Sequence, residues 1–338
     1  MIFICSPINN MLSRPDFLQK QIIFIGAEQI KTLKILNSTL QIKEHNETLS
    51  KVSLSKMFCL FVVWDCTITT QVFRKLSEFG VIVYLVSKSL RPIVMLGNNL
   101  QWNYLLRANQ YALDDESAIN LSKQLIQNKI QNQYDALSNI RTFWPKEKQL
   151  LLRIKENIQS CMLYTMPDAI RWVEWGAAKH YFSLMFWQVW RHRRAPRTKE
   201  DMLNFLLDMW YWFLYGFFES LLSMYGFDIY KWFFHTLFYE RKSLLCDVIE
   251  PRRCIIDLCI RKNINLKVFS YSDFFQEQNA YVLKKWKYIK YSEVFLKEIL
   301  RHKAVMYEYV RELYRVVLTQ KKTLPLYSYK NNIIECWL

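Results

Sequence analysis

The sequence predicts an α+β protein of two domains: a small β-rich N-terminal domain with one helix, followed by a large all-α helical C-terminal domain. In the first hundred residues, short runs rich in β-branched and aromatic residues alternate with polar turns. From about residue 101 onward, apolar residues recur at three- and four-residue steps, as they do in amphipathic helices. About half of the 338 residues (51%) are hydrophobic, so the chain can bury a sizeable core. We place the domain boundary between residues 1–98 and 99–338.

The predicted N-terminal domain passes from strands to a helix and back to strands. A helix is expected after Trp64, with Thr69 as its N-cap and Gly80 at its end. Polar turns, such as the one that begins at His45, separate the strands. Strands are expected at residues 21–25, 32–36, 40–43, 57–64, 81–86 and 93–96.

The predicted C-terminal domain consists of helices throughout. Residues Thr165 to Asp168 have the pattern of a capping box, which opens the helix that carries Glu174. Helices are expected at residues 105–113, 116–132, 147–163, 168–190, 201–225, 229–240, 252–263 and 280–318.

One apolar segment, at residues 202–225, could be mistaken for a membrane span. Asp208 and Glu219 interrupt it and leave ten uncharged residues between them, whereas a span needs about 20 apolar residues. We therefore expect a buried helix of a soluble protein and no membrane association. The eight cysteines form no C-x-x-C pair, and the N-terminus lacks a signal-peptide pattern, which indicates a reducing, cytoplasmic compartment.

The net charge narrows the class of partner. The chain has 46 Lys+Arg against 30 Asp+Glu, a formal charge of +16, which indicates a polyanion: nucleic acid or an acidic membrane surface. A generic basic protein with a solvated surface is the alternative interpretation. No G-x-G-x-x-G, P-loop, G-x-S-x-G or H-E-x-x-H pattern occurs, which argues against dinucleotide enzymes, NTPases, common serine hydrolases and zincins.

Three polar residues in apolar surroundings are candidates for a metal site. Glu174 shares a helix face with Ala177, Ala178 and Tyr181, and the two alanines leave room for a metal and a phosphate. His235 and Glu250 each follow a run of apolar residues, and Asp247 lies three residues before Glu250. Carboxylate oxygens suit Mg²⁺ or Mn²⁺, and an imidazole favours Mn²⁺. Taken singly, a glutamate paired with an arginine and a core histidine bonded to the backbone remain alternatives.

Seven segments, taken in order, form a recognisable series: Cys66-Thr-Ile-Thr-Thr70 with Leu76-Ser-Glu-Phe-Gly-Val-Ile-Val-Tyr84, Leu106-Arg-Ala-Asn-Gln110, Lys129-Ile-Gln-Asn-Gln133, Glu174 with Ala177 to Phe182, Pro196 to Tyr211, Gly226 to His235, and Ser243 to Asp257. The series resembles the CRISPR-associated integrase family, the endonuclease/integrase of spacer acquisition. The likeness extends through most of the chain and includes the spacings from His235 to Asp247 and to Glu250.

The resemblance implies a metal site and its chemistry. The family's metal ligands match Glu174, His235 and Glu250, and its additional acid matches Asp247. With Mg²⁺ or Mn²⁺ bound, the 3′-hydroxyl of a prespacer DNA would attack a phosphodiester at a repeat of the CRISPR array. The chain departs from the family pattern at four positions, which leaves the ligands intact but puts the shape of the pocket wall in doubt: Trp175, Trp232, Arg252 and Cys254.

The resemblance also implies partners. These are double-stranded DNA (prespacer and CRISPR repeat), a second copy of the chain that is contacted through the N-terminal domain, and the small second CRISPR adaptation protein, all in the cytoplasm of a prokaryote. We expect contacts to DNA from Tyr181, Arg193, Arg194, Arg197, Lys199, Arg252 and Arg253, with a solvated basic loop as the alternative. A DNA-repair or junction-cleaving nuclease and a catalytically dead DNA-binding scaffold are the rival functions.

Overall fold

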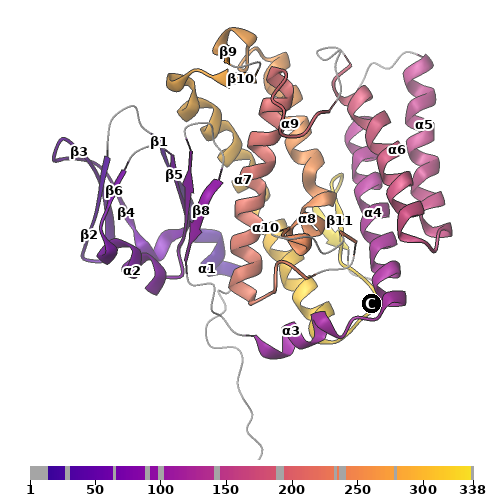
Figure 1. The fold of residues 1–338 in the computed structure, drawn as a ribbon, viewed down its shortest axis with the longest axis horizontal. Helices are drawn as coiled ribbons and strands as arrows, with labels where there is room; N and C mark the ends of the chain where they lie inside the picture. The colour runs from indigo at the N-terminus through magenta and orange to yellow at the C-terminus, as the bar shows by residue number, and fades with distance from the viewer. Residues whose placement is uncertain are drawn as a thin grey trace, which may run out of the picture.

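The computed structural model describes residues 14–26, 31–63, 66–87, 92–97, 103–140, 145–187, 194–231, 234–235, 241–277 and 280–335. Two four-stranded sheets form one end of the molecule, and helices form the remainder (Figure 1). The prediction of a β-rich N-terminal region followed by a large helical region is confirmed. The predicted boundary at residue 98 lies outside the described residues and stays a prediction.

The N-terminal sheets sandwich a small core. One sheet has the order β1-β5-β7-β8, with β8 antiparallel to its neighbour and the other strands parallel. The second sheet has the order β4-β3-β2-β6. The strands are β1 (Gln21–Gly26), β2 (Lys31–Leu36), β3 (Thr39–Glu44), β4 (Glu47–Ser53), β5 (Met57–Val63), β6 (Cys66–Ile68), β7 (Ile82–Val86) and β8 (Pro92–Leu96).

Strand β5 joins this core to the helical region. All seven of its residues are buried, because alternate side chains face opposite sides of the sheet. Leu60 and Val62 pack toward the second sheet and helix α2 (Thr70–Glu78), whereas Phe61 and Val63 pack toward the helices. A second N-terminal helix, α1 (Arg14–Gln19), was not predicted and packs on the helical region.

Helix α7 (Met202–Tyr225) lies in the middle of the molecule. Asp201 caps its N-terminus by accepting a hydrogen bond from the Asn204 N–H at 2.8 Å, and Gly226 ends it with φ 83°. The two acids that interrupt the apolar run each face a cation: Asp208 faces Arg194 and Glu219 faces Lys242, both at 2.5 Å. Within the described residues, no helix is long and apolar enough to cross a membrane.

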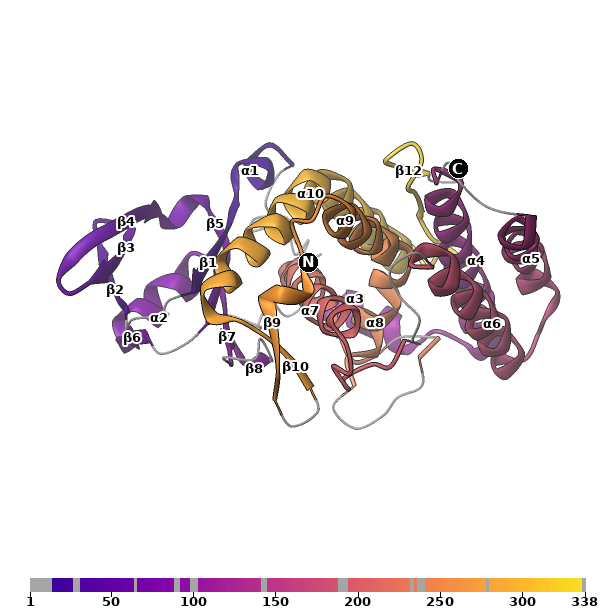
Figure 2. The same cartoon turned by 90° about the horizontal axis from the view of Figure 1, so that it is seen from above.

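The other helices surround α7, as the view from above shows (Figure 2). Helix α10 runs beside α7. Helices α4, α5 and α6 form a bundle at the end of the molecule farthest from the β4-β3-β2-β6 sheet. These helices are α3 (Tyr104–Tyr111), α4 (Asp115–Ser138), α5 (Pro145–Ser160), α6 (Pro167–Met185), α8 (Ser243–Ile249), α9 (Arg253–Asn265) and α10 (Tyr288–Leu318).

Two predicted helices differ from the structure. The described part of residues 229–240 is bent, without helix, and residues 280–283 form a strand rather than the start of α10. Two hairpins also belong to the helical region, one before α10 and one after it. They consist of β9 (Phe274–Glu277) with β10 (Ala280–Leu283), and of β11 (Leu326–Ser328) with β12 (Ile333–Glu335).

Candidate active site

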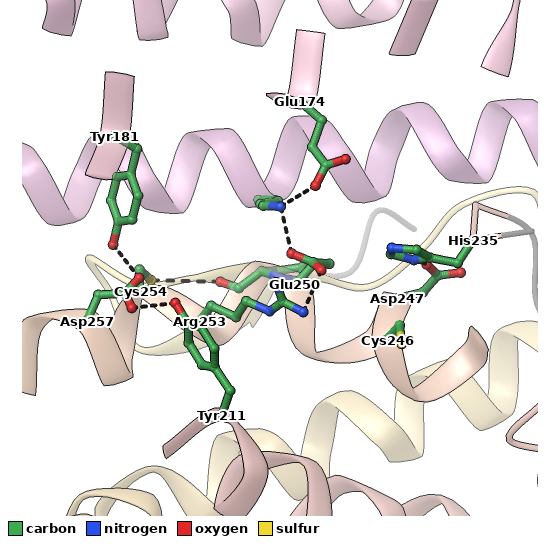
Figure 3. A network of polar contacts seen from close by, with 12 residues as sticks. Glu174, Tyr181, Tyr211, His235, Cys246, Asp247, Glu250, Arg253, Cys254 and Asp257 are labelled. Atoms are coloured by element: carbon green, nitrogen blue, oxygen red, sulfur yellow. Dashed lines mark hydrogen bonds and ion pairs between the residues drawn. The ribbon is translucent and has the colours of Figure 1, made fainter. Parts of the chain in front are cut away.

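The candidate active site lies where α4, α6 and the short 3₁₀ turn Glu250–Arg252 meet. Ala177 on α6 is fully buried, and its small side chain allows the two helices to pack closely. Lys129 projects from α4 with its Nζ 2.5 Å from Glu174 Oε1 and 2.7 Å from Glu250 Oε2. The two carboxylates, 76 positions apart in the sequence, thus face one ammonium group (Figure 3).

Glu250 is buried and held between two cations. Its Oε1 lies 2.9 Å from Arg253 Nη2, and its Oε2 faces Lys129. Burial by itself would raise the pKa of Glu250, but Arg253 and Lys129 lower it to about 2, so the group is ionised at neutral pH. Burial would likewise lower the pKa of Lys129, whereas Glu174 and Glu250 raise it, so the ammonium stays charged.

His235 is oriented by Asp247. The Nδ1 atom of His235 is hydrogen-bonded to Oδ1 of Asp247, and Oδ2 of Asp247 accepts a bond from the Phe234 N–H at 3.2 Å. Asp247 is fully buried, which raises the pKa of its carboxyl. A carboxylate on one ring nitrogen fixes the imidazole and leaves Nε2 as the atom that can bind a ligand.

An open cleft of about 870 Å³, here called the Glu174 cleft, collects these groups. Glu174, His235 and Glu250 all line it, so the three predicted ligands face the same cleft. Asp247 does not line the cleft and stands behind His235. Among the described residues, five cationic side chains line the same cleft: Arg194, Arg197, Lys199, Arg241 and Arg253.

The donor set fits a divalent metal ion, although in this structure the two carboxylates contact Lys129. Two carboxylates and an imidazole are oxygen and nitrogen donors suited to Mg²⁺ or Mn²⁺. Oε2 of buried Glu250 has its ionic contact with Lys129 but no well-oriented hydrogen bond, so it retains capacity for another ligand. Within the part of the chain that the structure describes, no group of three or more His, Cys, Asp or Glu side chains is already gathered as a metal centre.

The predicted basic loop reaches the cleft through α7. Arg194 donates to Asn204 Oδ1 (3.0 Å) and to Asp208 Oδ1 (2.5 Å), and the Arg197 N–H donates to Asp208 Oδ2 (2.8 Å). The Arg197 side chain is exposed, whereas Lys199 is mostly buried with its Nζ 5.0 Å from the Phe205 ring. Arg193 lies outside the described residues.

Two of the residues predicted to contact DNA have buried side chains in this structure. The Arg252 guanidinium is fully buried, 3.4 Å from the ring centre of Tyr309, and donates to the Val248 carbonyl at 3.0 Å. Tyr181 is also fully buried and donates its hydroxyl to Asp257 at 2.8 Å. Both side chains lie in the core around the site, where the rest of the fold covers them.

Lys129 and Arg241 are site residues to which the sequence analysis gave no role. Lys129 lies in one of the seven segments of the sequence analysis, and its position within the helix pattern indicates that it has a buried partner. It follows Ile126 by three residues and precedes Ile130 and Gln133 on one buried face of α4. A lysine on such a face needs a buried partner of opposite charge. No comparable pattern marks Arg241.

The chain is similar in sequence and in fold to known proteins. A protein of Thermodesulfovibrio yellowstonii named CRISPR-associated endonuclease Cas1 1 is 24% identical over 314 residues, covering 88% of this chain and 98% of that protein. Among solved structures, one titled Cas6-RT-Cas1–Cas2 complex shares the fold, with a TM-score of 0.78 and 20% identity over 90% of this chain and 36% of that longer chain.

A structure titled casposase bound to integration product shares the fold as well, with a TM-score of 0.73 and 19% identity over 91% of this chain and 94% of that chain. The family profile described as CRISPR associated protein Cas1 matches residues 26–296, a span that contains every predicted ligand. This chain belongs to the Cas1 family of CRISPR-associated proteins.

Proposed function

We propose that this protein is a divalent-metal-dependent DNA endonuclease and integrase of CRISPR adaptation. It joins the 3′-hydroxyl ends of prespacer DNA to phosphodiesters at the repeats of a CRISPR array by transesterification. The observation that carries the proposal is the Glu174 cleft, which is lined by Glu174, His235 and Glu250 and, among the described residues, by five cationic side chains. Acids that bind a hard cation and cations that bind phosphates are the two requirements of phosphoryl transfer.

The residues of the chain divide the work of the reaction. Glu174, His235 through Nε2, and Glu250 would hold one Mg²⁺ or Mn²⁺ ion, which when bound neutralises charge on the phosphoryl oxygens. Asp247 keeps the imidazole in one orientation. Arg197 and Arg241, which line the cleft, would contact DNA phosphates and align the two DNA ends, and alignment alone contributes much of the rate. One phosphodiester is exchanged for another, so no nucleotide cofactor is required.

The names of the relatives support the assignment. The curated relative is called an endonuclease, and the two structural neighbours carry the titles of a Cas1–Cas2 complex and of an integration product. On this basis we propose that the chain forms a homodimer, assembles with the small second CRISPR adaptation protein and binds double-stranded DNA in the prokaryotic cytoplasm. Sedimentation of the purified chain would test the dimer, and co-purification would test the second protein.

The test replaces Glu174 by Gln, which keeps the size of the side chain but removes its charge. We expect joining of a labelled prespacer to a repeat-containing plasmid to be lost, because a neutral amide binds a hard cation poorly. DNA binding by the same variant should persist, and EDTA should abolish joining by the wild type. Joining by Glu174→Gln at the wild-type rate would contradict the proposed site.

The same assay separates the rival functions. A catalytically dead scaffold would bind DNA without joining or cutting it in any metal. A junction-cleaving nuclease would cut branched DNA and release ends without joining them. His235→Ala and Glu250→Gln should match Glu174→Gln, and double variants should lose little more than single ones, as expected for residues that act as a unit.

A further inference from the structure

Two neighbouring cations balance the negative charge of the two predicted carboxylate ligands in this structure. Lys129 and Arg253 contact the carboxylates of Glu174 and Glu250, so two positive and two negative side chains form one group. Lys129 is 5% exposed and Glu250 is 3% exposed, so water does little to screen these charges. Oε1 of Glu174 and both carboxylate oxygens of Glu250 therefore already contact cations of the protein.

The surroundings add positive charge. Among the described residues that line the Glu174 cleft, five side chains are cationic and three are carboxylates, a net charge of +2 with His235 counted as neutral. Lys129 does not line the cleft and lies behind the two carboxylates, where it contributes one charge more. A divalent cation that enters the protein alone thus meets a site of its own sign. A phosphodiester of DNA brings the negative charge that is missing.

Building on the proposed function, we propose that the metal ion and DNA bind to this cleft cooperatively, and that Lys129 is the positioning residue that sets the cooperativity. In the free protein its ammonium holds Glu174 and Glu250 together and lowers their affinity for a divalent cation. When a phosphodiester binds to the cleft, the added negative charge offsets Lys129, and the carboxylates bind the metal tightly. Glu174 and Glu250 thus bind the divalent metal ion tightly when DNA is also bound.

Thermodynamic linkage makes the coupling measurable from both sides. If DNA raises the affinity for Mn²⁺ by some factor, Mn²⁺ must raise the affinity for DNA by the same factor. Coupling between two sites is typically on the order of 5- to 150-fold. For the wild type we expect Mn²⁺ to bind at least about tenfold more tightly with DNA than without it.

The experiment measures free Mn²⁺ by electron paramagnetic resonance during titration of the full chain, with and without a prespacer duplex. The duplex ends in 3′-dideoxynucleotides, so that no strand transfer occurs. We expect Lys129→Met to bind Mn²⁺ more tightly than the wild type in the absence of DNA, and DNA to enhance its binding several-fold less. Lys129→Arg keeps the charge and should retain the wild-type coupling. Lys129→Gln is the second neutral variant if Lys129→Met does not fold.

Lys242→Met is the matched control. Lys242 also forms an ion pair with a buried carboxylate, Nζ to Glu219 Oε1 at 2.5 Å, but Glu219 is outside the predicted ligand set. This variant has the same change of charge and should couple Mn²⁺ to DNA as the wild type does. Duplex without protein, titrated in parallel, gives the Mn²⁺ bound by DNA itself.

Two results would overturn different statements. The inference fails if, without DNA, both neutral variants bind Mn²⁺ no more tightly than the wild type does, and if DNA raises their Mn²⁺ affinity by the same factor as in the wild type. In that case Lys129 does not set the coupling. If the wild type binds no more Mn²⁺ than Glu174→Gln does, with or without DNA, the proposed metal site itself fails.

Discussion

Asp257 is a single residue whose protonation should be visible in the stability of the protein. It is 1% exposed and accepts hydrogen bonds from the hydroxyls of Tyr181 at 2.8 Å and Tyr211 at 2.6 Å. Burial raises the pKa of Asp257 to about 6, although the two tyrosines partly counter this. In the unfolded chain the pKa is about 3.9. The folded protein therefore binds this proton more tightly, which favours folding below about pH 4, and the advantage is lost as the pH rises through 6.

Replacing Asp257 by Asn removes this titration. We expect the free energy of unfolding of the wild type, relative to the variant, to fall by up to about 3 kcal/mol between pH 4 and pH 7, as a shift of two pKa units implies. Urea unfolding of both proteins in EDTA at several pH values measures the difference. If the free energies of unfolding of the wild type and the variant change equally with pH over this range, the raised pKa of Asp257 is contradicted.

At the scale of elements, the contact between α7 and the β1-β5-β7-β8 sheet depends on Gly216. A Cβ at this position would lie 3.0 Å from two ring atoms of Phe61 on β5, and the Gly216 carbonyl accepts a hydrogen bond from the Tyr84 hydroxyl at 2.8 Å. The absence of a side chain on α7 therefore allows the sheet to pack closely against the helix. This contact links the two regions of the fold through one continuous core.

Gly216→Val should destabilise the protein by about 1–3 kcal/mol, the usual cost of overpacking, because Phe61 has to move. Gly176→Ala on α6 is the control, since no heavy atom lies within 4 Å of the added Cβ. That change should stabilise the helix by about 0.5–1 kcal/mol. Chemical unfolding of the two variants gives both numbers, and a Gly216→Val protein as stable as the wild type would refute the packing argument.

At the scale of the whole molecule, the net charge is +16, and five cationic side chains among the described residues line the Glu174 cleft. Arg197 and Arg241 both line the cleft, and Arg197 is exposed. Arg194 is partly neutralised by Asp208 and is a weaker candidate for a phosphate contact. DNA affinity should therefore depend on salt mainly through a few residues of this cleft.

The double variant Arg197→Gln with Arg241→Gln should lower the slope of log binding constant against log salt by about 1.8, because each duplex phosphate contact contributes about 0.9. Fluorescence anisotropy with a labelled duplex at several salt concentrations measures the slope. The control removes two exposed cations that do not line the cleft, Arg74 on α2 and Lys297 on α10. An equal loss of slope in both double variants would mean that the cleft has no special role.

The sequence by itself determined the order of the two regions and the identity of the acids and the histidine. Periodicity is a local property, so residues 202–225 and β5 could be assigned from their own composition. The hairpin β9–β10 escaped prediction because each strand has only four residues, too few for alternation to stand out. Glu174, His235 and Glu250 could be identified from the sequence as candidate site residues, because ionisable groups in apolar surroundings require a partner.

Only the tertiary structure decided what those partners are. Lys129 is 45 residues from Glu174, and no local pattern encodes an ion pair over that distance. The same limit applies to Arg252 and Arg253, which are adjacent in the sequence and point to different surroundings. Arg252 is buried against Tyr309 on α10, whereas Arg253 forms an ion pair with Glu250 in the cleft. Periodicity shows which residues share one side of a helix, but the elements that arrive from elsewhere in the chain decide what each side contacts.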